Sequence, residues 1–318
     1  MTAGGIFEKF ASMTLPQVVL SLLLILSFSS TSHAMGRPKP GALLMGVMGD
    51  SISAGSLSDL PLKPFARSEG AVNAKLIWEN KRRLSWASGR AVASHFRLLG
   101  DYLRAEGEDQ KLFIENFATP KHRTRDLPGQ ARELVRHFKN GAYSSLIYVT
   151  VLIGSNDACD KPGPTPLDQM REELLKTFAI MSEIKQEDSI RILLVGIPRI
   201  PDLGAPSIRR THTPLLGLRC SFVRDRLFGF CPNLIGWRTV AQYHAAMDIV
   251  EERNRLLRST AAEATAAFPN LEIVYSNHLY NLEIPSELLA IDCFHPSKRG
   301  QEAISREVWL DQPWFITD

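Results

Sequence analysis

The chain has 318 residues, of which 44% are hydrophobic and 22% are charged, and its formal net charge is +3. This composition excludes an intrinsically disordered chain and provides enough apolar residues for one sizeable core. The small net charge gives no support to nucleic-acid binding, which needs a strongly basic surface.

The N-terminal segment has the pattern of a secretory signal. Lys9 lies in a polar lead, the apolar run VVLSLLLILSF follows over 18–28, and the small residues Ser32 and Ala34 suit a cleavage site. The run is shorter than the roughly 20 residues of a membrane-spanning helix. We predict a signal peptide over 1–34, a single domain over 35–318, and a secreted or periplasmic protein. An uncleaved anchor and a cytosolic product starting at Met35 are the alternatives.

Strand-like and helix-like segments alternate along the rest of the chain. The apolar runs rich in Ile, Val and Leu predict buried strands over 42–49, 111–118, 145–153, 190–197 and 271–276. Helical patterns lie between and after them, at about 88–106, 126–139, 167–186, 240–267 and 298–310. This alternation predicts an α/β fold with a parallel sheet that is covered by helices on both faces.

Two long loops, 56–87 and 198–239, each follow the end of a predicted strand. Loops of this length are uncommon unless they are functional or cross-linked. In an open parallel sheet, ligands bind at the carboxyl ends of the strands, near the point where the strand order reverses. The two loops are therefore expected to frame a site.

Polar residues follow the first and third predicted strands. Ser51 lies in the stretch MGDSISAG, and Asn156 lies in IGSND. If the two strands are neighbours, the Ser51 hydroxyl and the Asn156 amide meet at one edge, as a nucleophile and an oxyanion donor must. Ordinary turn chemistry explains each motif when it is taken alone.

A serine nucleophile needs a base, and one of the eight histidines has an acidic residue three positions before it. In the stretch IDCFHPS, Asp292 can orient the ring of His295, whose other nitrogen can then take the proton of Ser51. A surface pair that precedes a helix is the alternative interpretation. The order of the three motifs on one predicted parallel sheet favours a Ser51–His295–Asp292 triad.

These motifs resemble those of the SGNH, or GDSL, serine hydrolases. The segments RRLSWASG (82–89), RDLPGQARELVRHF (125–138), ERNRLL (252–257) and DCFHPSKRGQ (292–301) further resemble phospholipase B-like lipases of that family. The resemblance covers nearly all of 42–310. It implies a three-layer α/β/α sandwich with a central parallel sheet of about five strands in flavodoxin-like order, and ester hydrolysis through an acyl-enzyme without a cofactor.

The second family motif departs from its usual form in this chain. The family uses a Gly backbone N–H there in its oxyanion hole, and the corresponding position here falls at about Lys121. A Lys backbone N–H can still donate, whereas Pro120 has none to give. The resemblance therefore implies an oxyanion hole formed by the N–H of Ser51, the side chain of Asn156 and the N–H of Lys121.

The four cysteines fit an exported protein, and their spacing disfavours a metal site. Three pairings are possible, and the short separation favours Cys220–Cys231. Cys159 and Cys293 are then left, and the expected meeting of the Asn156 and His295 loops places them close together.

The sequence suggests a lipid substrate through two features. Trp78 and Trp86, with other apolar residues of 56–87, are candidates to line a groove for a long acyl chain, although they equally suit packing onto the core. The basic group over 121–125 suits contact with an anionic membrane surface, or simply a solvated loop.

We therefore predict an exported serine esterase that acts on fatty-acyl esters of lipids or phospholipids, with no metal. A short-chain or carbohydrate-ester deacetylase of the same fold is the main alternative. An inactive binding protein that retains the fold is the alternative from another class.

Overall fold

The computed structural model describes residues 41–58, 82–141, 143–159, 163–213 and 217–316. The predicted signal peptide, Trp78 and most of the loop over 56–87 lie outside the described residues. Among the helices of the described residues, none is long and apolar enough to cross a membrane.

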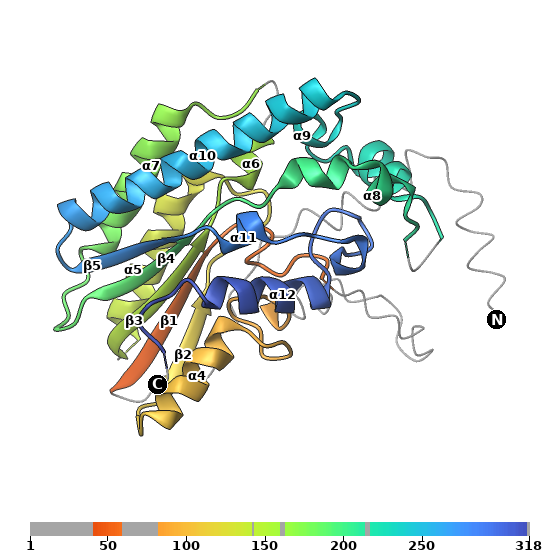
Figure 1. Ribbon diagram of the computed structural model, residues 1–318. Coiled ribbons are helices and arrows are strands. Elements are labelled where there is room, and N and C mark those ends of the chain that lie inside the picture. The colour runs from red at the N-terminus through yellow and green to blue at the C-terminus, as the bar shows by residue number, and fades with distance from the viewer. Residues whose placement is uncertain (1–40, 59–81, 142, 160–162, 214–216, 317–318) are drawn as a thin grey trace, which may run out of the picture.

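One parallel sheet organises the described chain (Figure 1). Its strands run in the order β2-β1-β3-β4-β5, as predicted for a parallel sheet of about five strands. Their bounds are β1 (Ala42–Gly49), β2 (Leu112–Asn116), β3 (Tyr143–Leu152), β4 (Ile190–Val195) and β5 (Leu271–Ser276). β1 lies between β2 and β3, so the strand order reverses beside β1, where ligands are expected to bind.

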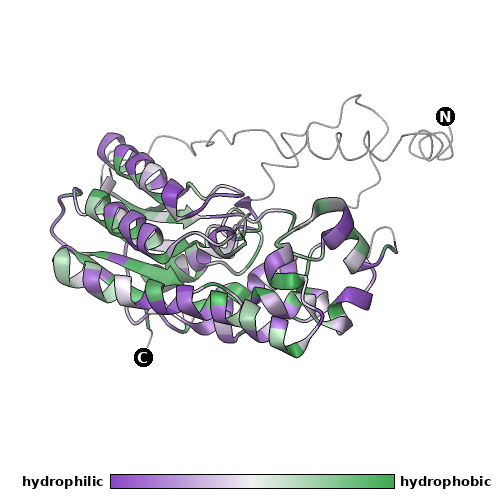
Figure 2. Ribbon diagram, turned by 90° about the horizontal axis from the view of Figure 1, so that it is seen from above, coloured by the Kyte–Doolittle hydropathy of each residue, from purple (hydrophilic) through white to green (hydrophobic). Residues whose placement is uncertain are grey.

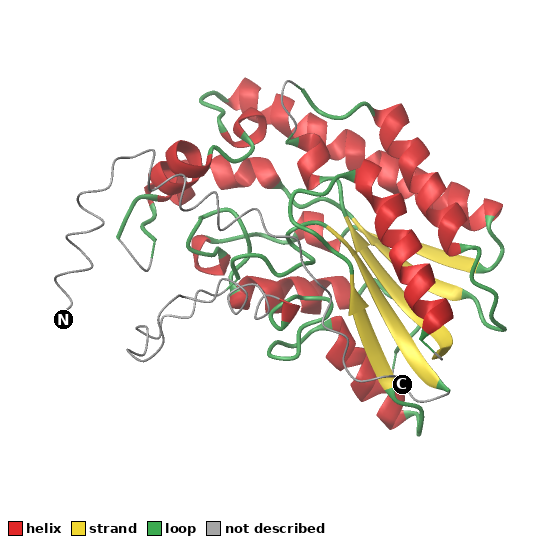
Figure 3. Cartoon of the chain, turned by 180° about the vertical axis from the view of Figure 1, so that it is seen from behind, coloured by secondary structure: helices red, strands yellow, loops and turns green. Residues whose placement is uncertain are grey.

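Helices cover both faces of the sheet, which gives three layers (Figure 3). Leu44 and Met48 of β1 pack into the cluster that includes α5 (Leu127–Asn140), α7 (Leu167–Met181) and α10 (Val240–Ala267). Met45 and Val47 face the opposite cluster, which includes α4 (His95–Ala105) and α12 (Lys298–Trp309). Since strand side chains alternate between faces, one continuous apolar run supplies both cores. Hydropathy colouring accordingly shows largely apolar strands between helices of mixed character (Figure 2).

The helix predicted from 88 begins only at His95. The side chain of Ser94 caps it by accepting a hydrogen bond of 3.3 Å from the backbone N–H of Arg97. The shorter elements are η1 (Thr124–Asp126), α6 (Ser155–Ala158), α11 (His278–Asn281) and η4 (Ser286–Leu288).

The segment expected to be a loop over 198–239 is largely helical. It contains η2 (Ile200–Gly204), α8 (Pro206–Arg210), η3 (Ser221–Phe228) and α9 (Pro232–Ile235). We call its described residues, 200–213 and 217–237, the cap segment.

The predicted cysteine pairing is wrong. Cys159 is bonded to Cys231, and Cys220 is bonded to Cys293. The physical reason is η3, which separates Cys220 from Cys231. η3 spans eight residues, Ser221–Phe228, so the two cysteines lie at opposite ends of a helical segment, whereas a disulfide needs α-carbons within about 7 Å. The cap segment is instead bonded to two other parts of the chain.

Candidate active site

The sheet brings the ends of β1 and β3 together. Gly49, the last residue of β1, is paired with Leu152, the last residue of β3. Ser51 therefore follows one strand end, and Asn156, in α6, follows the next strand along the sheet. Both side chains line one pocket, which His295 also lines. The residues predicted from three distant motifs thus meet at one edge.

The turn that carries Ser51 requires a glycine before it. Gly49 has φ +143°, and a β-carbon there would lie 2.2 Å from the carbonyl oxygen of Leu152. Asp50 is fully buried, and its Oδ1 accepts a hydrogen bond of 2.9 Å from the N–H of Ile52, which tightens the turn. Burial raises the pKa of Asp50 to about 7.

Two side chains hold the turn onto the rest of the domain. Asn116, at the end of β2, donates to the carbonyl oxygen of Ser53 at 3.0 Å. Gln301 of α12 donates to the carbonyl oxygen of Ile52 at 3.1 Å and accepts from the N–H of Trp86 at 2.8 Å. The position of Ser51 is therefore set by the edge strand β2 and by α12 together.

Ser51, His295 and Asp292 form one hydrogen-bonded line. The distance between Ser51 Oγ and His295 Nε2 is 2.9 Å, and His295 Nδ1 lies 2.5 Å from Asp292 Oδ2. Asp292 and His295 are 1% and 8% exposed, which shields their interaction from water. This geometry permits proton transfer from a serine hydroxyl to an imidazole that a carboxylate orients.

Asp292 also organises the loop that carries it. Its Oδ1 accepts hydrogen bonds from the N–H groups of Phe294 and His295, at 3.1 and 3.0 Å. Cys293, which follows Asp292 directly, has φ +56°, in the left-handed region, and is bonded to Cys220 of the cap segment. One carboxylate and one disulfide thus fix the loop that presents the imidazole.

Asn156 is held by the loop that follows β2. Its Nδ2 donates to the carbonyl oxygen of His122 at 2.9 Å, so that the second hydrogen of the amide is free to bind another acceptor. Gln130 of α5 supports this loop, since its Nε2 lies 2.8 Å from His122 Nδ1. The Gln130 side chain also accepts a hydrogen bond from the N–H of Gly49 at 2.7 Å and donates one to the carbonyl oxygen of Gly49 at 2.9 Å. Burial lowers the pKa of His122, which favours the neutral ring that accepts from Gln130.

Asp157 connects the same loop to α6 a second time. Its two carboxylate oxygens accept from the N–H and the hydroxyl of Thr124, at 3.0 and 2.8 Å. Burial raises the pKa of Asp157, and these hydrogen bonds oppose that rise. The two acidic residues next to Ser51 and Asn156 therefore hold turns in place.

Lys121 adopts the backbone conformation that a glycine would take most easily. Its φ is +69°, in the left-handed region. Within the described part of the chain, neither its N–H nor that of Ser51 donates to a protein acceptor. Both N–H groups are therefore available as donors to a bound oxygen.

Trp86 does not line the site, so that prediction is wrong. Its side chain is fully buried and packs edge-on against His95, with ring centroids 4.8 Å apart. His95 also bonds Tyr148 at 2.9 Å, and burial lowers its pKa to about 3. Trp86 belongs to the core cluster that also contains Leu99 of α4 and Ile304 of α12.

The sequence interpretation missed Gln130, His122 and Thr124. The sequence does contain a signal for Gln130, because this polar residue lies among Leu127, Ala131 and Leu134 on the buried face of α5. A polar side chain on such a face needs a buried partner. The roles of His122 and Thr124 depend on contacts across the fold and left no such signal. No group of three metal-ligating side chains lies together within the described ranges.

The fold and the aligned serine, histidine and aspartate are those expected of a hydrolase that uses a serine nucleophile. The family model for GDSL-like lipases and acylhydrolases matches residues 45–308. The chain belongs to this family, and membership supports the predicted hydrolysis of carboxylic esters. No curated protein matches the chain.

Several solved structures are similar to this chain. An acetylxylan esterase from Geobacillus stearothermophilus is 14% identical, with 89% of this chain and 100% of that one covered and a TM-score of 0.45. The lipase Lip_vut3 from a goat rumen metagenome is 15% identical over 85% and 97%, with a TM-score of 0.45. The psychrotrophic esterase EstA from Pseudoalteromonas sp. is 13% identical over 84% and 95%, with a TM-score of 0.41.

Proposed function

We propose that this chain is an exported serine esterase that hydrolyses carboxylic esters through an acyl-enzyme on Ser51. The observation that carries the proposal is the continuous line from the Ser51 hydroxyl through His295 to Asp292, with distances of 2.9 and 2.5 Å. A serine hydroxyl is a weak nucleophile by itself, and this line supplies the base that it needs.

The reaction follows from this geometry in two steps. His295 Nε2 takes the hydroxyl proton while Ser51 Oγ bonds the carbonyl carbon of the ester. The bond from that carbon to the alcohol oxygen then breaks, and the alcohol leaves with the proton from His295. In the second step His295 takes a proton from water, the water oxygen bonds the acyl carbon, and the acid leaves as Ser51 regains its proton.

The negative charge that develops on the carbonyl oxygen needs donors that are already in position. The Asn156 amide and the backbone N–H groups of Ser51 and Lys121 are the candidates. The bond from Asn156 to the carbonyl of His122 supports this role because it orients the amide before substrate arrives. Such preorganised donors are usually the largest single contribution to catalysis of this kind.

Export is part of the proposal. The predicted signal peptide supports it, as do the two disulfides, which persist in oxidising compartments. Contact with an anionic membrane surface through the basic group over 121–125 stays a prediction.

The alternatives differ in substrate or in activity. The motifs that resemble phospholipase B-like lipases favour fatty-acyl esters of lipids, while a small acyl group suits a short-chain or carbohydrate-ester deacetylase. An inactive binding protein is disfavoured, because such a protein has no need of a hydrogen-bonded serine, histidine and aspartate.

Covalent labelling tests the proposal directly. A fluorophosphonate probe is expected to label Ser51 of the wild-type protein, and Ser51→Ala is expected to lose both labelling and hydrolysis of p-nitrophenyl esters. Ser53→Ala is the matched control, since Ser53 is buried in the same turn and does not line the pocket. Folded wild-type protein that resists the probe would favour the binding protein.

A further inference from the structure

The pocket beside Ser51 is small and apolar. Ser51 and His295 lie at its wall, and the remaining lining is mostly aliphatic, including Ile200, Leu203, Leu279, Ile284, Leu289 and Ile304. Its cavity volume is about 40 Å³. One buried water needs roughly 10–15 Å³ of such volume, so the pocket holds about three waters.

This pocket suits the acyl part of an ester better than the alcohol part. The alcohol must leave after the first step and water must enter, whereas the acyl group stays bonded to Ser51. A mostly aliphatic pocket fits a group that remains and has no polar atoms. A methylene group is similar in size to a water molecule, so about three waters correspond to a chain of about four carbons including the carbonyl.

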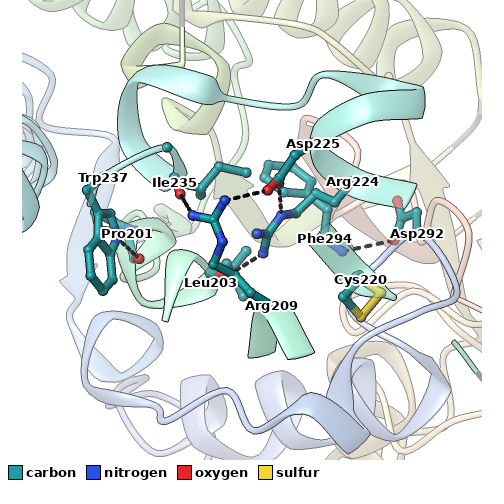
Figure 4. Close-up of polar contacts among 12 residues, drawn as sticks. Pro201, Leu203, Arg209, Cys220, Arg224, Asp225, Ile235, Trp237, Asp292 and Phe294 are labelled. Atoms are coloured by element: carbon teal, nitrogen blue, oxygen red, sulfur yellow. Dashed lines mark hydrogen bonds and ion pairs between the residues drawn. A yellow bond between two sulfur atoms is a disulfide. The ribbon is translucent and has the colours of Figure 1, made fainter. Parts of the chain in front are cut away.

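The cap segment fixes one wall of this pocket through polar contacts (Figure 4). The carbonyl oxygen of Leu203 accepts a hydrogen bond from Arg224, whose side chain is fully buried, and Trp237 Nε1 donates to Pro201 at 2.8 Å. Asp225 pairs with both Arg224 and Arg209, at 2.8 and 3.0 Å. Moving this wall outward would break the buried bond from Arg224 to Leu203, which is charge-assisted and therefore strong.

Two disulfides attach the same segment to both sides of the site. Cys231 is bonded to Cys159, which lines the pocket three residues after Asn156. Cys220 is bonded to Cys293, between Asp292 and His295. The cap segment is therefore not free to open away from either loop, and the pocket keeps its size.

We infer that the acyl group this enzyme transfers is short, with about two to four carbons, and that the cap segment sets this limit. The inference rests on the proposed function, since it concerns the group bonded to Ser51. It favours acetate, propionate and butyrate esters over the fatty-acyl esters that the sequence motifs suggest.

A series of p-nitrophenyl esters from acetate to laurate tests the inference. We expect the highest kcat/KM between acetate and butyrate and a fall of at least about tenfold by octanoate, because one methylene that does not fit costs roughly 10-fold or more. A maximum at octanoate or longer, or faster hydrolysis of a long-chain phospholipid in vesicles, would overturn it.

Variants of residues that line the pocket test which wall limits the length of the acyl chain. Leu203→Ala removes three carbons from the fixed wall and is expected to move the optimum to longer chains by about two or three carbons. Leu134→Ala is the matched control, since Leu134 is equally buried but lies in the core between α5 and β1, away from the pocket. If Leu203→Ala does not fold, Leu289→Ala widens another wall. An unchanged optimum in a folded pocket variant contradicts the inference.

Labelling separates this inference from the proposed function. Alkyl fluorophosphonates with ethyl and octyl chains report the fit at Ser51 with the same leaving group, fluoride, and the ethyl probe should react faster. Faster labelling of Ser51 by the octyl probe overturns only the short-chain inference. Failure of both probes to label Ser51 contradicts the proposed function, and the inference with it.

Discussion

The loop that carries His295 and the loop over 119–126 that carries Lys121 are held by different chemistry. On the base side, the loop with Asp292 and His295 is bonded covalently to the cap segment through Cys293 and Cys220. On the oxyanion side, the loop over 119–126 takes part in neither disulfide. It is held by hydrogen bonds that Gln130 and Asn156 donate and that Asp157 accepts.

A loop of an active site can be held in place by a disulfide or by a network of hydrogen bonds, and the two depend on different conditions. A disulfide limits the main chain and works only where the compartment keeps it oxidised. A network of buried amides and carboxylates does not depend on redox conditions, but every member must keep its partner. Changes to either loop are therefore expected to affect stability and the chemical step together, but only the loop that carries His295 should also respond to reduction of its disulfide.

The largest effect is expected at Asn156, where the oxyanion side meets the substrate. Asn156→Ala should lower kcat by roughly 10²–10³ with little change in KM, since the lost donor acts mainly in the transition state. Steady-state kinetics on p-nitrophenyl acetate measures this. Asn233→Ala is the matched control, because Asn233 donates to the carbonyl of Ala158 at 2.7 Å but does not line the pocket. Equal kcat for both variants would exclude Asn156 from the oxyanion hole.

The base side is tested by removing its disulfide. The double variant Cys220→Ala, Cys293→Ala should lose about 2–4 kcal/mol of unfolding free energy and should also lower kcat. Cys159→Ala with Cys231→Ala is the control, since the two bonds span 73 and 72 residues and should contribute similarly to stability. Urea unfolding and kcat are measured for both. If the two pairs lower kcat equally, the position of Cys293 between Asp292 and His295 has no special importance.

The hydrogen-bonded side is tested at Gln130. Gln130→Met keeps the approximate volume but leaves the backbone groups of Gly49 without their partner, at a cost of about 1–3 kcal/mol. We expect kcat to fall by about tenfold with KM nearly unchanged, which corresponds to about 1.4 kcal/mol in the barrier. Gln186→Met is the control, since Gln186 bonds both backbone groups of Leu146 near the start of β3. Equal losses of kcat would mean that Gln130 acts only through stability.

The sequence predicted the features that local pattern determines. Apolar runs located the strands, and the motifs around Ser51, Asn156 and His295 were placed at one edge because parallel strands end together. It misjudged what depends on tertiary packing. The closeness of Cys220 and Cys231 along the chain was misleading, because a helix holds them apart. Trp86 was buried by α4 and α12, which no local pattern around it could indicate.

The smallest effect is expected at Lys121, where the oxyanion loop departs from the family pattern. A residue with a β-carbon in the left-handed region costs about 1–2 kcal/mol, and Lys121 has φ +69°. Lys121→Gly removes this strain and keeps the N–H. Since the glycine also makes the unfolded chain more flexible, we expect the free energy of unfolding to rise by no more than about 1 kcal/mol. We expect kcat to stay unchanged. Lys121→Ala is the control, because it removes the side chain and keeps the strain. Urea unfolding and kcat distinguish the outcomes. If both variants lose kcat equally, the Lys121 side chain itself acts on the substrate, and the backbone N–H is not its only contribution.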